Sequence, residues 1–218
     1  SYPSALNLPI KTEDLPPFVE PYIELTSKMA FLAAQINKNA IKAVRIETHG
    51  QISEYANSLL TFAIVGALKE SLGDGINYVN AKFLCDEKGI KTESIVGGDS
   101  IFKNKITVRI TTQSDVVTIG GTVFGENQQR IVTINGFKTD FKPKGKMIIF
   151  KNNDVPGVIA KISSILADEK INIADFRLGR DDHGMALAVV LVDEKITKET
   201  LAKLNELDVC VWAKYAVI

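Results

Sequence analysis

The stretch KMIIFKNNDVPGVIAKISSILADEKINI, residues 146–173, decides how the C-terminal part of this chain folds. Its first apolar run, Met147–Phe150, predicts a buried strand. A polar loop follows, and a second strand is expected to start near Asn172. Between them, five apolar side chains recur at helical spacing and predict an amphipathic helix with one apolar face: Val158, Ile159, Ile162, Ile165 and Leu166.

The loop Asp154-Val-Pro-Gly157 has the residues of a helix start. Asp154 stands where an N-cap is expected, and Pro156 in a first helical turn loses nothing by lacking an N–H group. Gly157 leaves the backbone bare, so free N–H groups and the positive end of the helix dipole there suit a carboxylate or another anion. The same residues are equally explained as a helix cap with no ligand.

This block, followed by the helix and by Ile171-Asn-Ile173, resembles the start of an ACT domain, a small βαββαβ unit that binds amino acids and regulates metabolic enzymes. The rest of the chain fits such a unit in order. We expect a strand over 172–179, a turn over 181–184, a strand over 185–192, a helix over about 197–206 and a strand over 209–217. The resemblance covers residues 144–218.

The composition argues against several classes of partner. Lys and Arg number 26 and Asp and Glu number 26, so there is no basic excess to attract nucleic acid or an anionic membrane. The longest apolar run, Leu59–Leu68, is too short to span a bilayer. The chain is 45% hydrophobic and 24% charged, which is enough for one large or two small domains with real cores.

Cys85 and Cys210 are isolated and lack CxxC spacing, so neither a disulfide framework nor a zinc site is expected. Together with the absence of a signal-peptide pattern, this favours a reducing, cytoplasmic location. The sequence begins Ser-Tyr-Pro without a methionine, and we interpret it as a fragment of a longer protein.

The N-terminal part predicts a linker and then a helix. Residues 1–17 hold four of the seven prolines and no apolar periodicity. The next helix carries Pro21 in its first turn and presents a narrow apolar seam: Phe18, Tyr22, Leu25, Met29, Leu32 and Ile36. The seam fits a helix docked on its own domain, and equally one that packs on a missing domain or a partner subunit.

The middle region predicts two helices and a run of strands. A strand at 43–48 precedes a helix over 54–72, with Ser53 as its cap and Gly73 as its end. A short strand at 76–79 is expected next, and then a helix that Asn80 caps and Gly89 ends. Five strands then follow, over 90–96, 105–113, 115–124, 128–134 and 137–142.

Two dipeptides in these strands indicate specific backbone features. Asn135-Gly136 predicts a hairpin with a type I′ turn, and Gly120-Gly121 indicates a bulge or a close backbone approach. The expected fold class is α+β: a mixed α/β intervening domain with antiparallel strands, followed by the ferredoxin-like βαββαβ unit.

The middle region also has a resemblance. The segments 77–90 (NYVNAKFLCDEKGI) and 130–136 (RIVTING) resemble the intervening, "allosteric substrate binding" domain of long-form D-3-phosphoglycerate dehydrogenases. Asn7-Leu-Pro9 and the seam helix look like the tail of that enzyme's substrate-binding domain. The resemblance implies three parts: 1–38 from the catalytic region, 39–143 as the intervening domain and 144–218 as the ACT domain.

The same resemblance implies a function. This region would sense L-serine and assemble the homo-oligomer in the NAD-dependent first enzyme of serine biosynthesis. The NAD-binding domain and the catalytic His and Arg would precede Ser1. The chain itself has no G-x-G-x-x-G after a strand, so we predict no NAD site, no catalytic residue and no hydride transfer in it.

The remaining polar residues do not suggest catalysis. His49 and His183 fall at predicted strand ends or turns and are expected to be solvated. Asp181-Asp182 precede a glycine and are expected to form a turn rather than a catalytic carboxylate pair. No metal site is predicted.

The resemblance carries an effector site, in which serine lies between ACT domains of neighbouring subunits. Matched to the family's motif, its residues are Asn152, Asp154, Gly157 and Asn172. A zwitterion needs acceptors for its ammonium group, which Asp154 offers, and donors for its carboxylate, which Asn172 and the helix-start N–H groups offer. Asn152 departs from the His or Tyr often found at its position. Asn172 is also explained as an ordinary turn residue.

Arg130 and Lys142 match basic residues that form an anion site in some family members, although exposed basic residues on strands need no ligand. Two other functions stay open. One is the regulatory domain pair of an iron–sulfur L-serine dehydratase, and the other is a pure assembly module.

Overall fold

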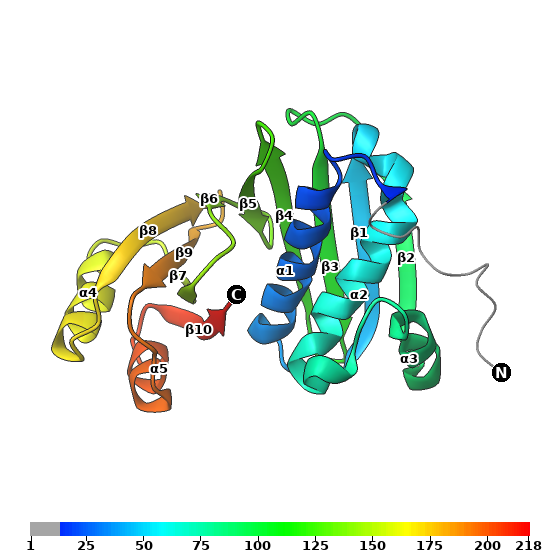
Figure 1. Cartoon of the computed structure of the whole chain (residues 1–218). Helices are drawn as coiled ribbons and strands as arrows, with labels where there is room; N and C mark the ends of the chain where they lie inside the picture. The colour runs from blue at the N-terminus through cyan, green and yellow to red at the C-terminus, as the bar shows by residue number, and fades with distance from the viewer. Residues whose placement is uncertain (1–13) are drawn as a thin grey trace.

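The computed structural model describes residues 14–218 and contains two sheets, each with helices on one face (Figure 1). The predicted linker up to residue 13 and Asn7-Leu-Pro9 lie outside the described residues. The fold class is α+β, as expected. The elements of the first unit are α1 (Glu20–Ile36), β1 (Ile41–His49), η3 (Gln51–Tyr55), α2 (Ala56–Leu72), η4 (Gly73–Gly75), α3 (Ala81–Lys88), β2 (Lys91–Val96), β3 (Lys105–Thr112), β4 (Val116–Phe124), β5 (Gln128–Ile134) and β6 (Phe137–Phe141).

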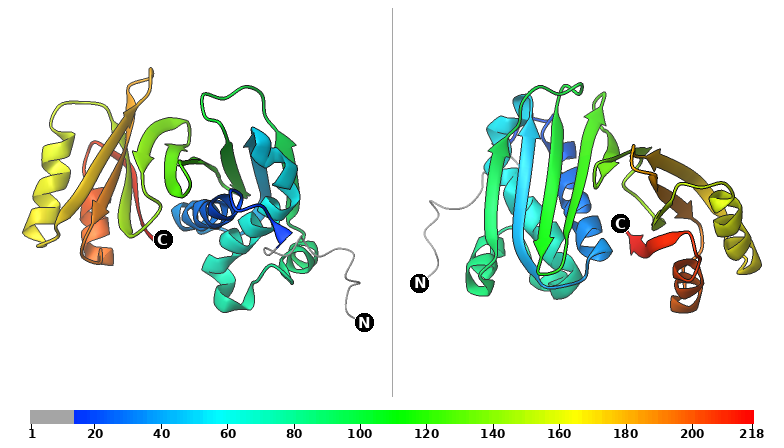
Figure 2. Two further views of the ribbon diagram at one scale, coloured as in Figure 1. Left: turned by 45° about the horizontal axis from the view of Figure 1, so that its top comes forward. Right: turned by 180° about the vertical axis from the view of Figure 1, so that it is seen from behind.

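The first sheet has six strands in the order β2-β1-β3-β4-β5-β6, with β2 parallel to β1 and every other pair antiparallel. Helices α1 and α2 cover one face, and the view from behind shows the strands of the other face free of helices (Figure 2). Strand β1 alternates accordingly: Val44 and Ile46 are fully buried, whereas Arg45 points outward and pairs with Glu93.

Helix α1 resolves the two interpretations of its seam in favour of docking within the chain. Tyr22, Leu25, Met29, Leu32 and Ile36 are all at most 4% exposed. They share one core with α2 and with strands of the six-stranded sheet. Helix α1 is therefore part of the core of the first unit. The predicted division had instead placed it in a separate part, residues 1–38.

Three local predictions in the first unit were wrong. No strand forms at Ile76–Val79, where the chain turns and Val79 is 57% exposed. Ser53 does not cap a helix, because it lies within η3 and its buried hydroxyl has no partner among the described residues. Asn80 occupies the N-cap position of α3, but its side chain accepts from the N–H of Asn77 instead of from the helix.

The two glycine features of the strands are confirmed. Asn135 and Gly136 have φ of 49° and 81° between β5 and β6, as a type I′ turn requires. The pairing of β4 with β5 shifts between Gly120 and Gly121. A Cβ atom on Gly121 would lie 2.6 Å from the sulfur of Met29, so this glycine lets α1 approach the sheet.

The second unit has the connectivity βαββαβ that the sequence predicted. Its sheet is antiparallel throughout, in the order β10-β7-β9-β8, with α4 and α5 on one face (Figure 1). Strands β8 and β10 are therefore the two edges. Its elements are β7 (Lys146–Asn153), α4 (Val158–Asp168), β8 (Ile173–Arg180), β9 (Met185–Val192), α5 (Lys198–Asn205) and β10 (Cys210–Val217).

The other face of the second sheet packs on the first unit. Met147, Ile149, Leu187 and Val189 belong to the same core cluster as the residues of α1. Strand β8 also approaches β6 closely, because a Cβ atom on Gly179 would lie 2.3 Å from the backbone oxygen of Lys138. The second sheet is thus enclosed between its own two helices and the first unit.

Candidate functional site

The loop between β7 and α4 has a different structure from the predicted cap. Helix α4 begins at Val158, after Gly157 with φ 91°, and no side chain caps it. Pro156 precedes the helix, so its placement in the first turn was also wrong. The carboxylate of Asp154 is engaged elsewhere: its Oδ2 accepts from Nε of Arg180 at 2.7 Å.

The start of α4 therefore keeps its backbone donors open. The first bond of the helix runs from the N–H of Lys161 to the oxygen of Gly157, at 3.0 Å. The N–H groups of Val158, Ile159 and Ala160 have no partner among residues 14–218. Three open donors and the positive end of the dipole make this loop suited to a carboxylate.

Asn152, just before this loop, is 1% exposed. Its Nδ2 donates to the oxygen of Asn153 at 2.8 Å, but its buried Oδ1 has no partner among the described residues. An unsatisfied buried acceptor costs about 1–3 kcal/mol, so a ligand ammonium or hydroxyl group that reached this oxygen would recover that cost.

The turn before β9 supports the loop. The N–H of Asp154 donates to the oxygen of Gly184 at 2.9 Å. The carboxylate of Asp181 accepts from the N–H groups of Met185 and His183, and these bonds, chiefly that from Met185, lower its pKa. His183 is exposed, as expected, and the predicted turn is confirmed.

Asn172 does not join the other site residues within one chain. It precedes β8, whose first residue Ile173 pairs with Val192 at the end of β9. Asn152 instead pairs with Ala186 at the start of β9. Asn172 is bonded to the two acidic residues that follow β9: its Nδ2 donates to Asp193 at 2.6 Å and its N–H to Glu194 at 2.7 Å.

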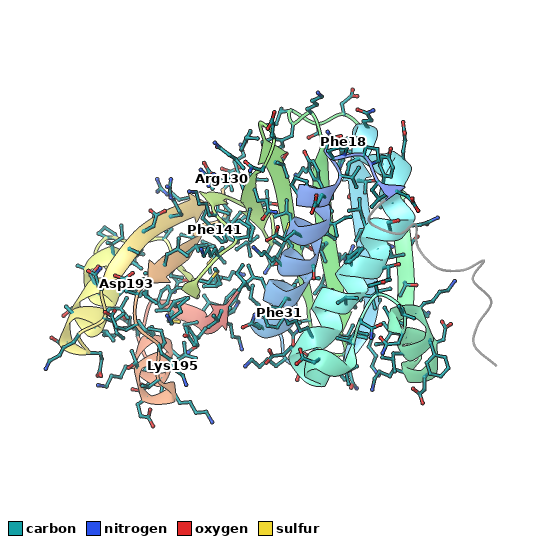
Figure 3. All side chains as sticks on the ribbon, in the orientation of Figure 1. Phe18, Phe31, Arg130, Phe141, Asp193 and Lys195 are labelled. Atoms are coloured by element: carbon teal, nitrogen blue, oxygen red, sulfur yellow. The ribbon has the colours of Figure 1, made fainter. Side chains whose placement is uncertain are left out.

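Arg130 and Lys142 lie close in the first unit. Arg130 is on β5, and Lys142 follows the end of β6, one residue beyond the pair Ile131 and Phe141. The guanidinium of Arg130 is 3.4 Å from the carboxylate of Asp140, so part of its charge is already balanced. Figure 3 shows Arg130 near the second unit, above Phe141.

The prediction that His49 is solvated was wrong. Its side chain is 14% exposed, with Nδ1 2.7 Å from the oxygen of Gly98 and Nε2 3.2 Å from the carboxylate of Glu47. These contacts hold the end of β1 to the Gly97-Gly98 segment. Both thiols are free, and burial raises the pKa of Cys85 and of Cys210 to about 11, so neither is a ready nucleophile at neutral pH.

Among residues 14–218 no cluster of three potential metal-binding side chains occurs, and no helix is long and apolar enough to cross a membrane. The sequence reasoning missed Arg180, which holds Asp154 in the loop. These residues are 26 positions apart, and the pairing of β9 with both β7 and β8 brings them together.

Comparison with known proteins agrees with this architecture. Residues 18–135 match the family model of the D-3-phosphoglycerate dehydrogenase intervening domain. The chain belongs to this family. Residues 146–209 match the model of the ACT domain.

Three relatives share the name D-3-phosphoglycerate dehydrogenase. The D-3-phosphoglycerate dehydrogenase of Bacillus subtilis is 34% identical over 203 residues, which cover 90% of this chain and 39% of that protein. Those of Archaeoglobus fulgidus and a Synechocystis species are 32% and 27% identical, over 97% and 93% of this chain and 41% and 37% of their own lengths. The chain thus spans about two fifths of the dehydrogenases it matches.

The two matches fall on the two sheets. The intervening-domain match covers residues 18–135, so it includes α1 and strands β1 to β5 of the six-stranded sheet and ends before β6. The open loop at α4 and Asn152 lie in the ACT domain, and Arg130 lies in the intervening domain.

Proposed function

We propose that this chain is the regulatory region of a D-3-phosphoglycerate dehydrogenase, in which the ACT domain senses L-serine or a similar small amino acid. The observation that carries the proposal is Asn152, whose buried side-chain oxygen lacks a partner beside a helix start with open donors. A zwitterion needs both kinds of group in one place.

The chemistry of the loop suits each part of serine. The N–H groups of Val158, Ile159 and Ala160 would receive the carboxylate. The carboxylate of Asp154, 21% exposed, would accept from the ammonium group in place of, or together with, Arg180. The side-chain oxygen of Asn152 would accept from the hydroxyl or the ammonium group.

A second copy of the chain would supply Asn172. Strand β8 is an edge, and antiparallel pairing of two such edges about a two-fold axis brings residue 173 of one copy opposite residue 180 of the other. Asn172 of the second copy would then stand beside Arg180 and the loop. Exposed apolar side chains flank this edge and favour the contact: Val155, Ile159 and Leu178, which are 47%, 51% and 41% exposed.

The regulatory mechanism would be linkage. Serine that contacts two copies stabilises one arrangement of subunits, and that arrangement then disfavours the motions of the catalytic domains, with a coupling of about 1–3 kcal/mol. Hydride transfer with NAD would belong to other parts of the enzyme. The residues here do not fit that cofactor, because no glycine-rich turn joins a strand to a helix in the required pattern.

Arg130 and Lys142 support a further proposal, an anion site at the end of β6. Arg130 lies on β5 and Lys142 directly follows the neighbouring strand β6, but Asp140 already balances part of the charge. Anion binding there would have to compete with this carboxylate.

Titration calorimetry with L-serine, together with light scattering, tests the sensing role. We expect saturable heat and a dimer or larger assembly. Asn152→Leu removes the unpartnered oxygen at similar volume, so binding should be lost while the melting temperature holds. An oligomer that gives no heat with L-serine would leave only the assembly function, and a monomer at high concentration would contradict the shared site.

A further inference from the structure

A hollow lies where the two units meet, away from the loop at α4. It has a volume of about 750 Å³ and is lined by the end of α1 and the residues after it, by the segment that leads into α5, and by β10. In Figure 3, Lys195 is labelled beside α5, in the segment that enters this hollow. Its walls therefore come from both units.

The lining of this hollow is strongly basic. Four lysines contribute to it and no carboxylate does: Lys38, Lys195, Lys198 and Lys214. Lys38 pairs with Glu70 at 3.2 Å, but no acid lies within 4.0 Å of the other three ammonium groups in the described part of the chain. Three uncompensated positive charges around one hollow repel one another and favour an anion.

A larger hollow shows that this charge is not a general property of the surface. It has a volume of about 1300 Å³ and lies at the start of α1. Its lining holds Glu20, Glu24 and Glu126 against Lys103. That hollow has no reason to attract an anion.

The edge of β10 adds a backbone donor. The amide of Asn205 bonds the N–H and oxygen of Ala213, at 2.9 and 3.1 Å, and the amide of Gln35 does the same for Val217, at 3.0 and 3.1 Å. Backbone groups of an antiparallel strand point alternately to either side, so Tyr215, midway between, also points its N–H outward. No partner for this N–H exists within residues 14–218, and Tyr215 lines the hollow.

We propose that this hollow binds a small organic anion with two or more negative charges, either a phosphate ester or a polycarboxylate. Lys195, Lys198 and Lys214 supply the charge, and the N–H of Tyr215 fixes the orientation. Residues 35–39 of the first unit line the same hollow, so an anion bound there would also fasten the ACT domain to the intervening domain. This site shares no residue with the serine site or with Arg130 and Lys142.

Thermal unfolding and calorimetry with sodium pyrophosphate, with sodium citrate and with sodium chloride at equal ionic strength test the proposal. We expect saturable binding of at least one polyvalent anion and a higher melting temperature than in chloride. The stronger of the two responses tells a phosphate ester from a polycarboxylate. Equal responses in all three salts would mean general screening and would overturn the site.

Matched variants locate the binding. Lys198→Gln with Lys214→Gln should weaken it by about tenfold or more, because two charge-assisted hydrogen bonds to the anion are lost. Lys82→Gln with Lys91→Gln removes the same charge from exposed positions on α3 and β2 and should leave it unchanged. An equal loss in both pairs, or a loss in Arg130→Gln with Lys142→Gln alone, would overturn the assignment.

An amide spectrum gives an independent readout. In the unaltered chain, pyrophosphate should shift the Tyr215 resonance more than those of Ala213 and Val217, whose N–H groups are already bonded. A Tyr215 resonance that does not move at saturation would contradict the proposal. L-serine should not move it, so failure of the serine site would leave this result intact.

Discussion

The two helices of the ACT domain begin in opposite ways. Helix α5 has Thr197 as its N-cap, and the side-chain oxygen accepts from the N–H of Thr200 at 3.1 Å. Helix α4 begins after Gly157 at φ 91°, with no side-chain cap. Both helices follow a central strand of one sheet and lie on the same face, so topology does not cause the difference.

The two helix starts differ in what the nearby polar side chain is bonded to. Thr197 satisfies a donor of its own helix, which stabilises a start by about 1 kcal/mol. Asp154 is bound to Arg180 instead, so α4 forgoes that stabilisation and keeps its donors open. A helix start without a side-chain cap, beside the unpartnered side-chain oxygen of Asn152, is a better candidate for binding than a capped one.

Asp154→Ala should give the largest effect. We expect serine affinity to fall by about tenfold or more, because a charged acceptor for the ammonium group is lost. Unfolding free energy should fall by less than about 1 kcal/mol, since the structure replaces the expected cap by an ion pair with Arg180, which is 71% exposed. Calorimetry and urea unfolding measure the two quantities.

Asp182→Ala is the matched control for that variant. Asp182 is an exposed acid in the turn that contacts the loop, and it forms no ion pair among residues 14–218. Equal losses of serine affinity in the two variants would reduce the role of Asp154 to general electrostatics.

Gly157→Ala should cost about 1–2 kcal/mol of stability, because an L side chain is strained at φ 91°. No atom lies within 4 Å of the added Cβ, so the cost comes from the backbone alone. A change of the backbone would also move the open donors and weaken serine binding. Urea unfolding that shows no loss would mean that α4 tolerates another start.

Gly184→Ala controls for the glycine itself. It has φ 79° and an equally empty surrounding, but it lies in the turn before β9. We expect a similar loss of stability with less effect on serine binding. A larger loss of binding than in Gly157→Ala would place the critical backbone in the turn instead.

Thr197→Val tests the closed helix start and should cost about 1 kcal/mol, because it keeps the side-chain shape and removes the capping oxygen. Serine binding should stay as it is, since α5 takes no part in the site. If the variant lost serine binding with unchanged stability, the contrast between the two helices would fail.

The fold of the ACT domain could be predicted because its periodicity is strong. The buried run of β7 and the apolar face of α4 allow few ways to pack the helix on the sheet. In the first unit, the Asn135-Gly136 turn and the Gly120-Gly121 bulge could be predicted because each depends on two adjacent residues. The strand expected at Ile76–Val79 failed because three apolar residues do not reveal whether a core lies beside them. There the chain turns and exposes Val79.

The site was harder to predict because its contacts are distant in sequence. Asp154 has the residue type and position of a cap, and nothing near it indicates that Arg180 takes its carboxylate. The opposite ends occupied by Asn152 and Asn172 follow from strand pairing, not from spacing. The basic hollow likewise combines Lys38 with Lys195 and Lys214, which no motif connects.

The smallest expected effect is the loss at low pH of an ion pair that links the two helices. Lys161 of α4 donates to the carboxylate of Asp208, which follows α5, at 3.0 Å, and this bond is the main reason that the pKa of Asp208 is lowered from 3.8. Since the folded pKa is the lower one, the stabilisation is present above pH 3.8 and is lost as pH falls through the folded value.

Asp208→Asn should therefore lower the melting temperature slightly at pH 6, with the difference from the parent chain vanishing in strong acid. Serine binding at pH 7 should not change, because the ion pair joins the flanks of the helices and leaves the open donors of α4 untouched. A difference in melting temperature that persisted in strong acid would show that Asp208 acts through its backbone contacts instead of through Lys161.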